Sequence, residues 1–167
     1  MKLDVTKAIL QLAKPFPFSG EVAIPPQDVN GETITFDTVT LEGTFFAGDD
    51  STIRVDGTVK TVAHGQCARC MQPAATPINI TFGETFAKNV DEAEDERFTF
   101  TGKEINLDHM TLTLCLLTLP GRFLCKDDCE GSPAWKAYQA NHKPQIEEGS
   151  YHPFAQLGSL LNMDEEV

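Results

Sequence analysis

Runs in which apolar and polar residues alternate recur through the first half of the chain. They cover residues 16–24, 34–46, 51–62 and 76–86, and Pro-Pro, Gly-Asp and cysteine-containing turns separate them. A period of two places successive side chains on opposite faces of a strand, so each run predicts a half-buried strand. Several such strands in succession predict a mainly antiparallel sheet or half-barrel.

The second run changes phase in its middle. Ile34 and Phe36 occupy even positions, whereas Val39 and Leu41 occupy odd positions. One extra residue near positions 37–38 would return all four side chains to one face, because a β-bulge sets two residues of one strand against one residue of its partner. We therefore expect a bulge at this point.

The third and fourth runs are expected to pair as a hairpin with one buried face. A turn that contains Cys67-Ala68-Arg69-Cys70 joins them. Opposed side chains of an antiparallel pair share a face, and this requirement fixes the register. The apolar side chains expected on the buried face are Ile53, Val55, Val59, Ile78, Ile80 and Phe82.

Helical spacing is confined to short segments. Residues 4–13 predict a helix that begins at Asp4 as its N-cap and ends before Pro15, and Val5, Ile9 and Leu12 would fall near one face. Because these helices accompany a sheet, we expect an α+β fold with two or three short helices.

Two later segments are also candidates for helices. Residues 104–120 fit helical and strand spacing equally, and their threonines favour a strand. Ser132-Pro133 predicts the start of a short helix on which Trp135 and Tyr138 share a face. These two rings would form either a small hydrophobic cluster or a platform on which RNA bases stack.

The last part of the chain differs in composition. Residues 141–152 are polar, and helical spacing returns after Pro153. We expect one mainly β domain with cysteine turns over residues 1–140, then a polar linker and a short C-terminal helix over residues 141–167. Phe154 and Leu157 would lie on one face of this helix, either docked on the sheet or, as we expect, anchoring a partner.

The charge narrows the choice of partner. The formal net charge is −12, and a surface this acidic repels phosphate, which argues against a broad nucleic-acid footprint and favours a basic protein. No signal peptide or membrane-spanning run is recognisable. We therefore expect a cytoplasmic protein, whose cysteines stay reduced.

Four of the five cysteines form two close pairs. Cys67 and Cys70 make one pair, and Cys125 and Cys129 make the other. Two such turns, when the fold brings them together, supply the four thiolates of a structural zinc site. The alternative is four reduced thiols without metal. Cys115 lies in the most apolar segment and is expected to be a core thiol.

Catalytic motifs are not recognisable, so we interpret the chain as non-enzymatic. One rival is a thiol-disulfide oxidoreductase that uses Cys67 and Cys70, with Arg69 stabilising a thiolate, but that chemistry needs a helix start that the strand pattern after Pro73 does not offer. A second rival is a purely structural zinc module. Arg69, Arg122 and Lys126 would form a basic spot for partner or RNA contact if the turns meet.

An ordered set of short motifs resembles the bacterial YceD family. The motifs are Gly57-Thr58-Val59, Cys67-Ala68-Arg69-Cys70, Glu104-Ile105-Asn106-Leu107, Leu117-Thr118-Leu119-Pro120, Cys125 with Cys129-Glu130-Gly131, and Pro153-Phe154-Ala155-Gln156-Leu157. The resemblance implies a factor that supports accumulation of large-subunit ribosomal RNA. The family's genes commonly adjoin one for a small basic ribosomal protein, so the implied partner is that protein or the RNA.

The same resemblance bears on two open points. The family's segment equivalent to residues 107–119 is helical, which favours a helix here despite the threonines. Many members keep the first cysteine pair but have an incomplete second one, so a zinc ion is not implied for the family as a whole. This chain retains both pairs.

Overall fold

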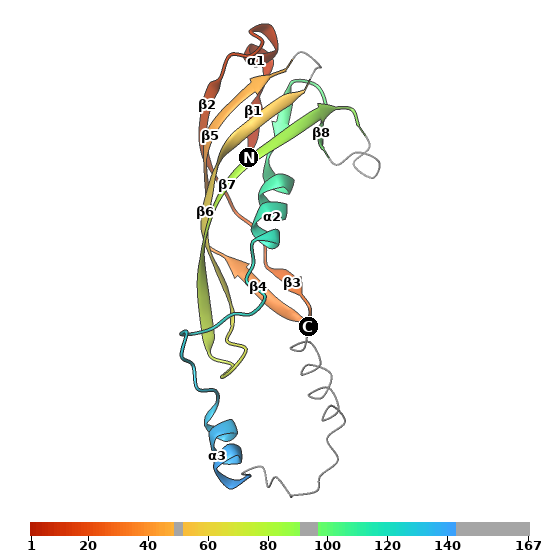
Figure 1. Ribbon diagram of the computed structural model, residues 1–167. Helices are drawn as coiled ribbons and strands as arrows, with labels where there is room; N and C mark the ends of the chain where they lie inside the picture. The colour runs from red at the N-terminus through yellow and green to blue at the C-terminus, as the bar shows by residue number, and fades with distance from the viewer. Residues whose placement is uncertain (49–51, 91–96, 143–167) are drawn as a thin grey trace, which may run out of the picture. The chain divides into compact units, whose positions relative to one another are not determined.

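The computed structural model describes residues 1–48, 52–90 and 97–142. Contacts divide the chain into two compact units, Met1–Gly131 and Ser132–Val167. No helix among the described residues is long and apolar enough to cross a membrane. The elements in chain order (Figure 1) are β1 (Lys2–Asp4), α1 (Thr6–Leu10), β2 (Phe16–Val22), β3 (Gln27–Val29), β4 (Glu32–Phe36), β5 (Val39–Ala47), β6 (Ile53–Gln66), β7 (Pro73–Lys88), β8 (Phe98–Phe100), β9 (Glu104–Asn106), α2 (Asp108–Leu117) and α3 (Pro133–Asn141).

The first unit is built on a seven-stranded sheet in which β6 is the central strand. β7 pairs with β6 along its whole length, and β5 and β4 pair with successive parts of its other edge. β2, β3 and β8 extend the sheet beyond β5, β4 and β7. Among the described strands, β7 and β8 are the one parallel pair, and β1 and β9 form a separate two-stranded sheet. The predicted α+β fold with a mainly antiparallel sheet is confirmed, and the described strands form an open sheet.

The β6–β7 hairpin has the predicted pairing and the predicted buried face. Val59 lies opposite Ile80, and Gly57 lies opposite Phe82. Five of the six side chains expected on that face are buried, and Ile80 is partly buried against the same core. The alternation of apolar and polar residues was enough to predict this buried face, because one face of the hairpin is covered by the core and the other meets solvent.

The predicted extra residue lies between β4 and β5. Phe36 pairs with Ala63, whereas Thr40 pairs with Lys60, so one chain advances four residues while β6 advances three. The extra residue interrupts the ladder, so that β4 ends at Phe36 and β5 begins at Val39. Both parts keep their apolar side chains on one buried face, where they contribute Ile34, Val39 and Leu41.

The N-terminal helix is shorter than predicted, and its buried face differs. Lys2–Asp4 form β1, which pairs with β9, and α1 covers only Thr6–Leu10. The carboxylate of Asp4 accepts a hydrogen bond from the backbone N–H of Thr6 at 2.8 Å. Val5 is buried as predicted, but Ile9 and Leu12 are exposed, and Ala8 is the other residue of this segment that is buried in the core. The pairing of β1 with β9, which is distant in sequence, determines the conformation of residues 2–4. The spacing of apolar residues within a segment gives no information about such a long-range contact.

The ambiguous segment before Pro120 is helix α2, as the family resemblance implied. Its threonines fit a helix because they bond to the preceding turn. The hydroxyl of Thr111 donates to the carbonyl of Leu107 at 2.7 Å, and that of Thr118 donates to the carbonyl of Leu114 at 2.8 Å. Such bonds let a β-branched polar residue remain helical, and they satisfy Thr111, which is fully buried.

Buried side chains form two groups in the first unit. The larger group lies between the sheet and α2 and includes Met110 and Cys115 of that helix. The smaller group lies toward the turn of the β6–β7 hairpin and consists of Ile34, Ala63, Cys67, Ala74, Ile78, Phe123 and Cys129. Two of the paired cysteines therefore belong to the smaller core.

The described part of the second unit is helix α3. The Ser132 hydroxyl accepts a hydrogen bond from the backbone N–H of Trp135 at 3.2 Å, and Pro133 occupies the first turn, as the sequence predicted. The rings of Trp135 and Tyr138 stack at 5.6 Å, and that of His142 stacks on Tyr138 at 4.2 Å. Trp135 and Tyr138 are about half exposed, so they do not form a buried cluster within the described residues.

Two glycines at the centre of the sheet let β5 and β6 approach closely. Gly43 lies directly opposite Gly57. A Cβ atom on Gly43 would overlap the carbonyl oxygen of Asp56, which belongs to the neighbouring strand. The outer positions of the same row are Phe18 and Phe82, which are both buried. Aromatic side chains beside strand glycines fill the space that the glycines leave.

Replacing Gly43 with alanine should therefore destabilise the sheet. We expect a loss of about 2 kcal/mol in the free energy of unfolding, because the backbone of β6 cannot yield as a flexible side chain would. For a chain of this size that loss lowers the melting temperature by about 5 °C. Gly121→Ala is the matched control, since a Cβ atom there meets open space. Equal melting temperatures of the two variants in thermal circular dichroism would contradict this account of the sheet.

Candidate metal centre

The first cysteine pair lies in the turn between β6 and β7. The backbone N–H of Cys67 donates to the carbonyl of Gln72 at 2.8 Å, and that of Met71 donates to the carbonyl of Cys67 at 2.9 Å. Met71 has a φ of 64°, which closes the turn in the left-handed region. These bonds hold Cys67 and Cys70 on one tight loop at the end of a long, regular hairpin.

The second pair lies in the loop that follows α2. The backbone N–H of Cys129 donates to the carbonyl of Lys126 at 3.2 Å, which folds the loop back on itself. Two hydrogen bonds join this loop to the hairpin turn. The backbone N–H of Ala68 donates to the carbonyl of Phe123 at 2.9 Å, and Arg69 Nη1 donates to the carbonyl of Cys129 at 2.7 Å. The protein's own hydrogen bonds thus bring the two turns together.

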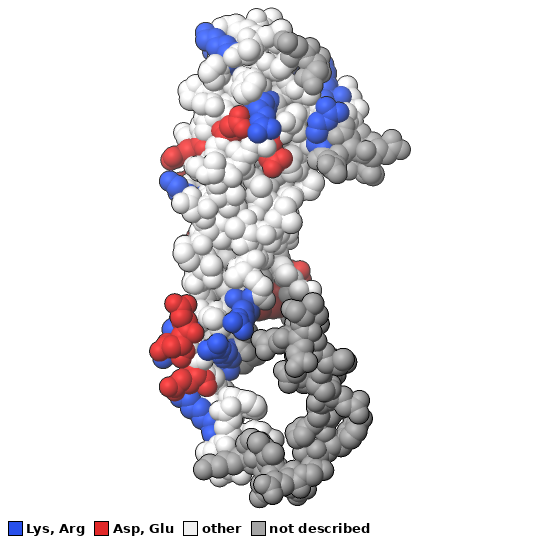
Figure 2. All heavy atoms as spheres, in the orientation of Figure 1, with Lys and Arg blue, Asp and Glu red and all other residues white. Residues whose placement is uncertain are grey.

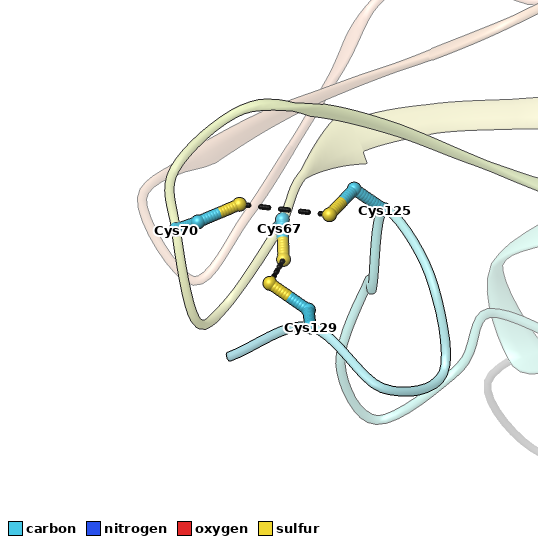
Figure 3. Close-up of side chains that lie close together, drawn as sticks. All are labelled: Cys67, Cys70, Cys125 and Cys129. Carbon is cyan, nitrogen blue, oxygen red and sulfur yellow. Dashed lines mark hydrogen bonds between the residues drawn. The ribbon is translucent and has the colours of Figure 1, made fainter. Parts of the chain in front are cut away.

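The four sulfur atoms converge as the cysteine spacing predicted. They all lie within 4.8 Å of one another. Cys67 Sγ lies 3.8 Å from Cys129 Sγ, and Cys70 Sγ lies 3.6 Å from Cys125 Sγ (Figure 3). Zinc–sulfur bonds of about 2.3 Å in a tetrahedron require sulfur atoms about 3.8 Å apart. The arrangement therefore fits one tetrahedral ion of the size of zinc.

Burial and acidity differ among the four thiols. Cys67 and Cys129 are buried, Cys70 is partly buried and Cys125 is exposed. Backbone N–H groups of Cys125 and Arg69 lower the pKa of Cys67 to about 6, because they stabilise its thiolate. Hydrogen bonds with the Cys70 and Cys129 side chains raise the pKa of Cys125 to about 12. A metal ion that binds all four sulfurs must therefore displace the proton of Cys125 at neutral pH.

The lowered pKa of Cys67 does not by itself distinguish a metal ligand from a redox dithiol. The same N–H groups would stabilise a metal-bound thiolate and a reactive one. The turn that holds Cys67 and Cys70 is followed by strand β7, however, and not by a helix. The helix N-terminus that lowers thiol pKa values in Cys-x-x-Cys oxidoreductases is thus missing beside this turn.

The three basic residues expected at the turns lie among acidic ones. Arg69 is engaged with the carbonyl of Cys129, and Lys126 Nζ lies 3.7 Å from a carboxylate oxygen of Asp128. Arg122 borders a cavity beside the turn. The loop also carries Asp127 and Glu130. Charges of both signs therefore surround the cysteines, and Figure 2 shows the same mixture on the face that it draws.

Other residues named from the sequence lie apart from the cysteine cluster. Cys115 is buried in the larger core, where burial raises the pKa of its thiol to about 11. Phe154 and Leu157, the expected partner anchors, lie outside the described residues.

A cavity of about 420 Å³ beside the cysteine turn was not predicted. Residues from the β3–β4 hairpin, the end of α2 and the cysteine turn line it, including Glu32, Leu119 and Phe123. The Glu32 carboxylate accepts a hydrogen bond from the backbone N–H of Gln66 at its wall. Three segments distant in sequence build this cavity, so no local pattern could have indicated it.

Comparison with known proteins gives a family match that covers both cysteine turns and the elements around them. The family described as "Large ribosomal RNA subunit accumulation protein YceD" matches residues 55–161. Uncharacterized proteins of Mycobacterium bovis and of two Mycobacterium tuberculosis strains are each 32% identical over 84 residues. These matches cover 47% of this chain and only 41% of each relative. No solved structure matches the chain.

The family match includes both cysteine turns, the β6–β7 hairpin from Val55 onward and helix α2. It also includes most of the C-terminal segment. Because the match covers more than half of the chain, it establishes membership: the protein belongs to the YceD family of large ribosomal RNA subunit accumulation proteins.

Proposed function

We propose that this protein is a non-catalytic factor that supports accumulation of large-subunit ribosomal RNA by binding a component of the large subunit. The observation that carries the proposal is the family match over residues 55–161. The family name indicates a role linked to that RNA, and it describes accumulation and not a reaction. Within this role, the four clustered cysteines would stabilise the fold and would not take part in catalysis.

The proposed ion is a structural zinc. The sulfur atoms are spaced as a tetrahedral zinc site requires, and they come from two segments that the chain separates widely. The smaller core beside these sulfurs contains few large apolar side chains, so apolar burial stabilises it only modestly. A metal ion that joins the two cysteine turns would therefore add a larger share of its stability. Zinc would therefore fasten the loop after α2 to the end of the β6–β7 hairpin.

The proposed partner is a basic ribosomal protein, with the RNA as the alternative. A net charge of −12 favours a cationic partner and disfavours extended contact with phosphate. The basic side chains near the cysteines are balanced by Asp127, Asp128 and Glu130, so they offer RNA only a small contact. Phe154 and Leu157 remain the proposed apolar anchors for the partner.

The zinc proposal predicts that the protein, purified without chelator, carries one zinc ion per chain. Cys125→Ser should lose the ion and lower the melting temperature by about 5 °C or more, because the metal cross-link between the loop and the hairpin is lost and only hydrogen bonds then join them. Cys125 is exposed, so the substitution itself buries no new polar group. Lys126→Ala, the adjacent control, should keep both the zinc and the melting temperature. Zinc-free wild-type protein, or equal melting of both variants, would refute the proposal.

The partner proposal is tested by capture of the tagged full chain from bacterial lysate, with and without nuclease. We expect a small basic protein of the large subunit to be retained after nuclease treatment. Truncation after Gly149 should abolish its retention without changing the melting temperature, and Gln156→Ala in the full chain should change neither. Retention lost on nuclease treatment would instead favour RNA as the partner.

A truncated protein that melts several degrees lower would show that the tail belongs to the fold. Recovery of no ribosomal component by any form of the protein would leave the purely structural zinc module as the better description. A titration that shows one reactive thiolate, together with disulfide-exchange activity, would favour the oxidoreductase alternative.

A further inference from the structure

The two close sulfur contacts at the metal centre both run between the turns. Cys70 of the hairpin turn faces Cys125 of the loop, and Cys67 faces Cys129 (Figure 3). The hydrogen bonds from Ala68 and Arg69 to the loop keep the turns together without help from an ion. The sulfurs would therefore remain neighbours after a metal had left.

These two contacts also differ in their access to solvent. Cys67 and Cys129 are both buried and form an inner pair, whereas Cys70 is partly buried and Cys125 is exposed, so they form an outer pair. A small oxidant in solution therefore reaches the outer pair first. A disulfide has a sulfur–sulfur bond of about 2.05 Å, so the sulfurs in each pair must approach by about 1.6–1.8 Å.

We propose that a hydroperoxide converts this centre into a two-disulfide form in which Cys70 is joined to Cys125 and Cys67 to Cys129. The inference rests on the zinc centre proposed above and assigns its regulation to the same four sulfurs. It also excludes the two within-turn pairings that the sequence spacing alone would suggest. The metal-bound and oxidised states would thus connect the same two segments.

The chemistry balances with the hydroperoxide as the oxidant. The Cys125 sulfur attacks a peroxide oxygen, the O–O bond breaks, and a sulfenic acid and water form. The Cys70 sulfur then attacks the sulfenic sulfur, the S–S bond forms, and the oxygen leaves as a second water. The inner pair reacts in the same way. In total, a zinc tetrathiolate, two hydrogen peroxide molecules and four protons give two disulfides, one free zinc ion and four water molecules.

The two disulfides would keep the hairpin turn covalently joined to the loop after α2 once the metal has left. The outer pair spans 55 positions of the chain and the inner pair spans 62. Disulfides that close loops of this length restrict the unfolded chain strongly. We therefore expect the oxidised, zinc-free protein to melt within a few degrees of the zinc-bound protein and well above the reduced, chelated protein.

The sequence allows an unambiguous test by peptide mapping of the full chain treated with hydrogen peroxide. Trypsin cleaves after Arg69 and Lys126, which places the four cysteines in four different peptides. We expect residues 61–69 linked to 127–136 and residues 70–88 linked to 123–126. The thiol of Cys115, in residues 104–122, is the internal control and should remain unlinked. A chromogenic chelator should report one zinc released for two peroxides consumed.

Two variants sharpen the test. Cys70→Ser should still form the inner link and leave Cys125 as a free thiol, whereas Cys129→Ser should form only the outer link. Links between residues 61–69 and 70–88, or between 123–126 and 127–136, in the wild-type protein would overturn the proposal. Zinc-free protein that still forms the two predicted links would refute only the zinc centre. Zinc-bound protein that forms within-turn links would refute only the pairing.

Discussion

The antiparallel ladder between β6 and β7 supports both cores and positions the first cysteine turn. It runs without interruption from Ile53 opposite Phe86 to Gln66 opposite Pro73. One end of the ladder carries the larger core under α2, and the other end carries the smaller core and the first cysteine turn. A slip of one residue would expose the buried face and would also rotate Cys67 away from the second cysteine loop.

The two ends are stabilised by different means. Near the larger core, apolar burial is extensive, and β1, β9 and α2 all contribute to it. Toward the cysteine turn, the buried group is smaller, and its neighbours are a short hairpin and a loop without regular structure. A metal centre placed there would supply the stability that apolar packing does not. Two of the four sulfurs, those of Cys67 and Cys129, are themselves part of the smaller core.

Much of this organisation could be predicted from the sequence, because its determinants are local. The alternation of apolar and polar residues predicted the strands. The change of phase near residues 37–38 predicted the extra residue between β4 and β5. The cysteine spacing predicted that the four sulfurs converge. The contacts that the sequence did not reveal join distant segments. The pairing of β1 with β9 shortened the first helix, and Arg69 Nη1 donates a hydrogen bond to the Cys129 carbonyl, 60 positions away in the chain.

The proposed zinc ion would bind all four paired thiolates and join the loop after α2 to the hairpin. The measurement to make is zinc K-edge X-ray absorption of protein purified without chelator. We expect four sulfur ligands at about 2.3 Å and no nitrogen or oxygen ligand in the first shell. A first shell that contains nitrogen or oxygen ligands, or a sample without stoichiometric zinc, would contradict it.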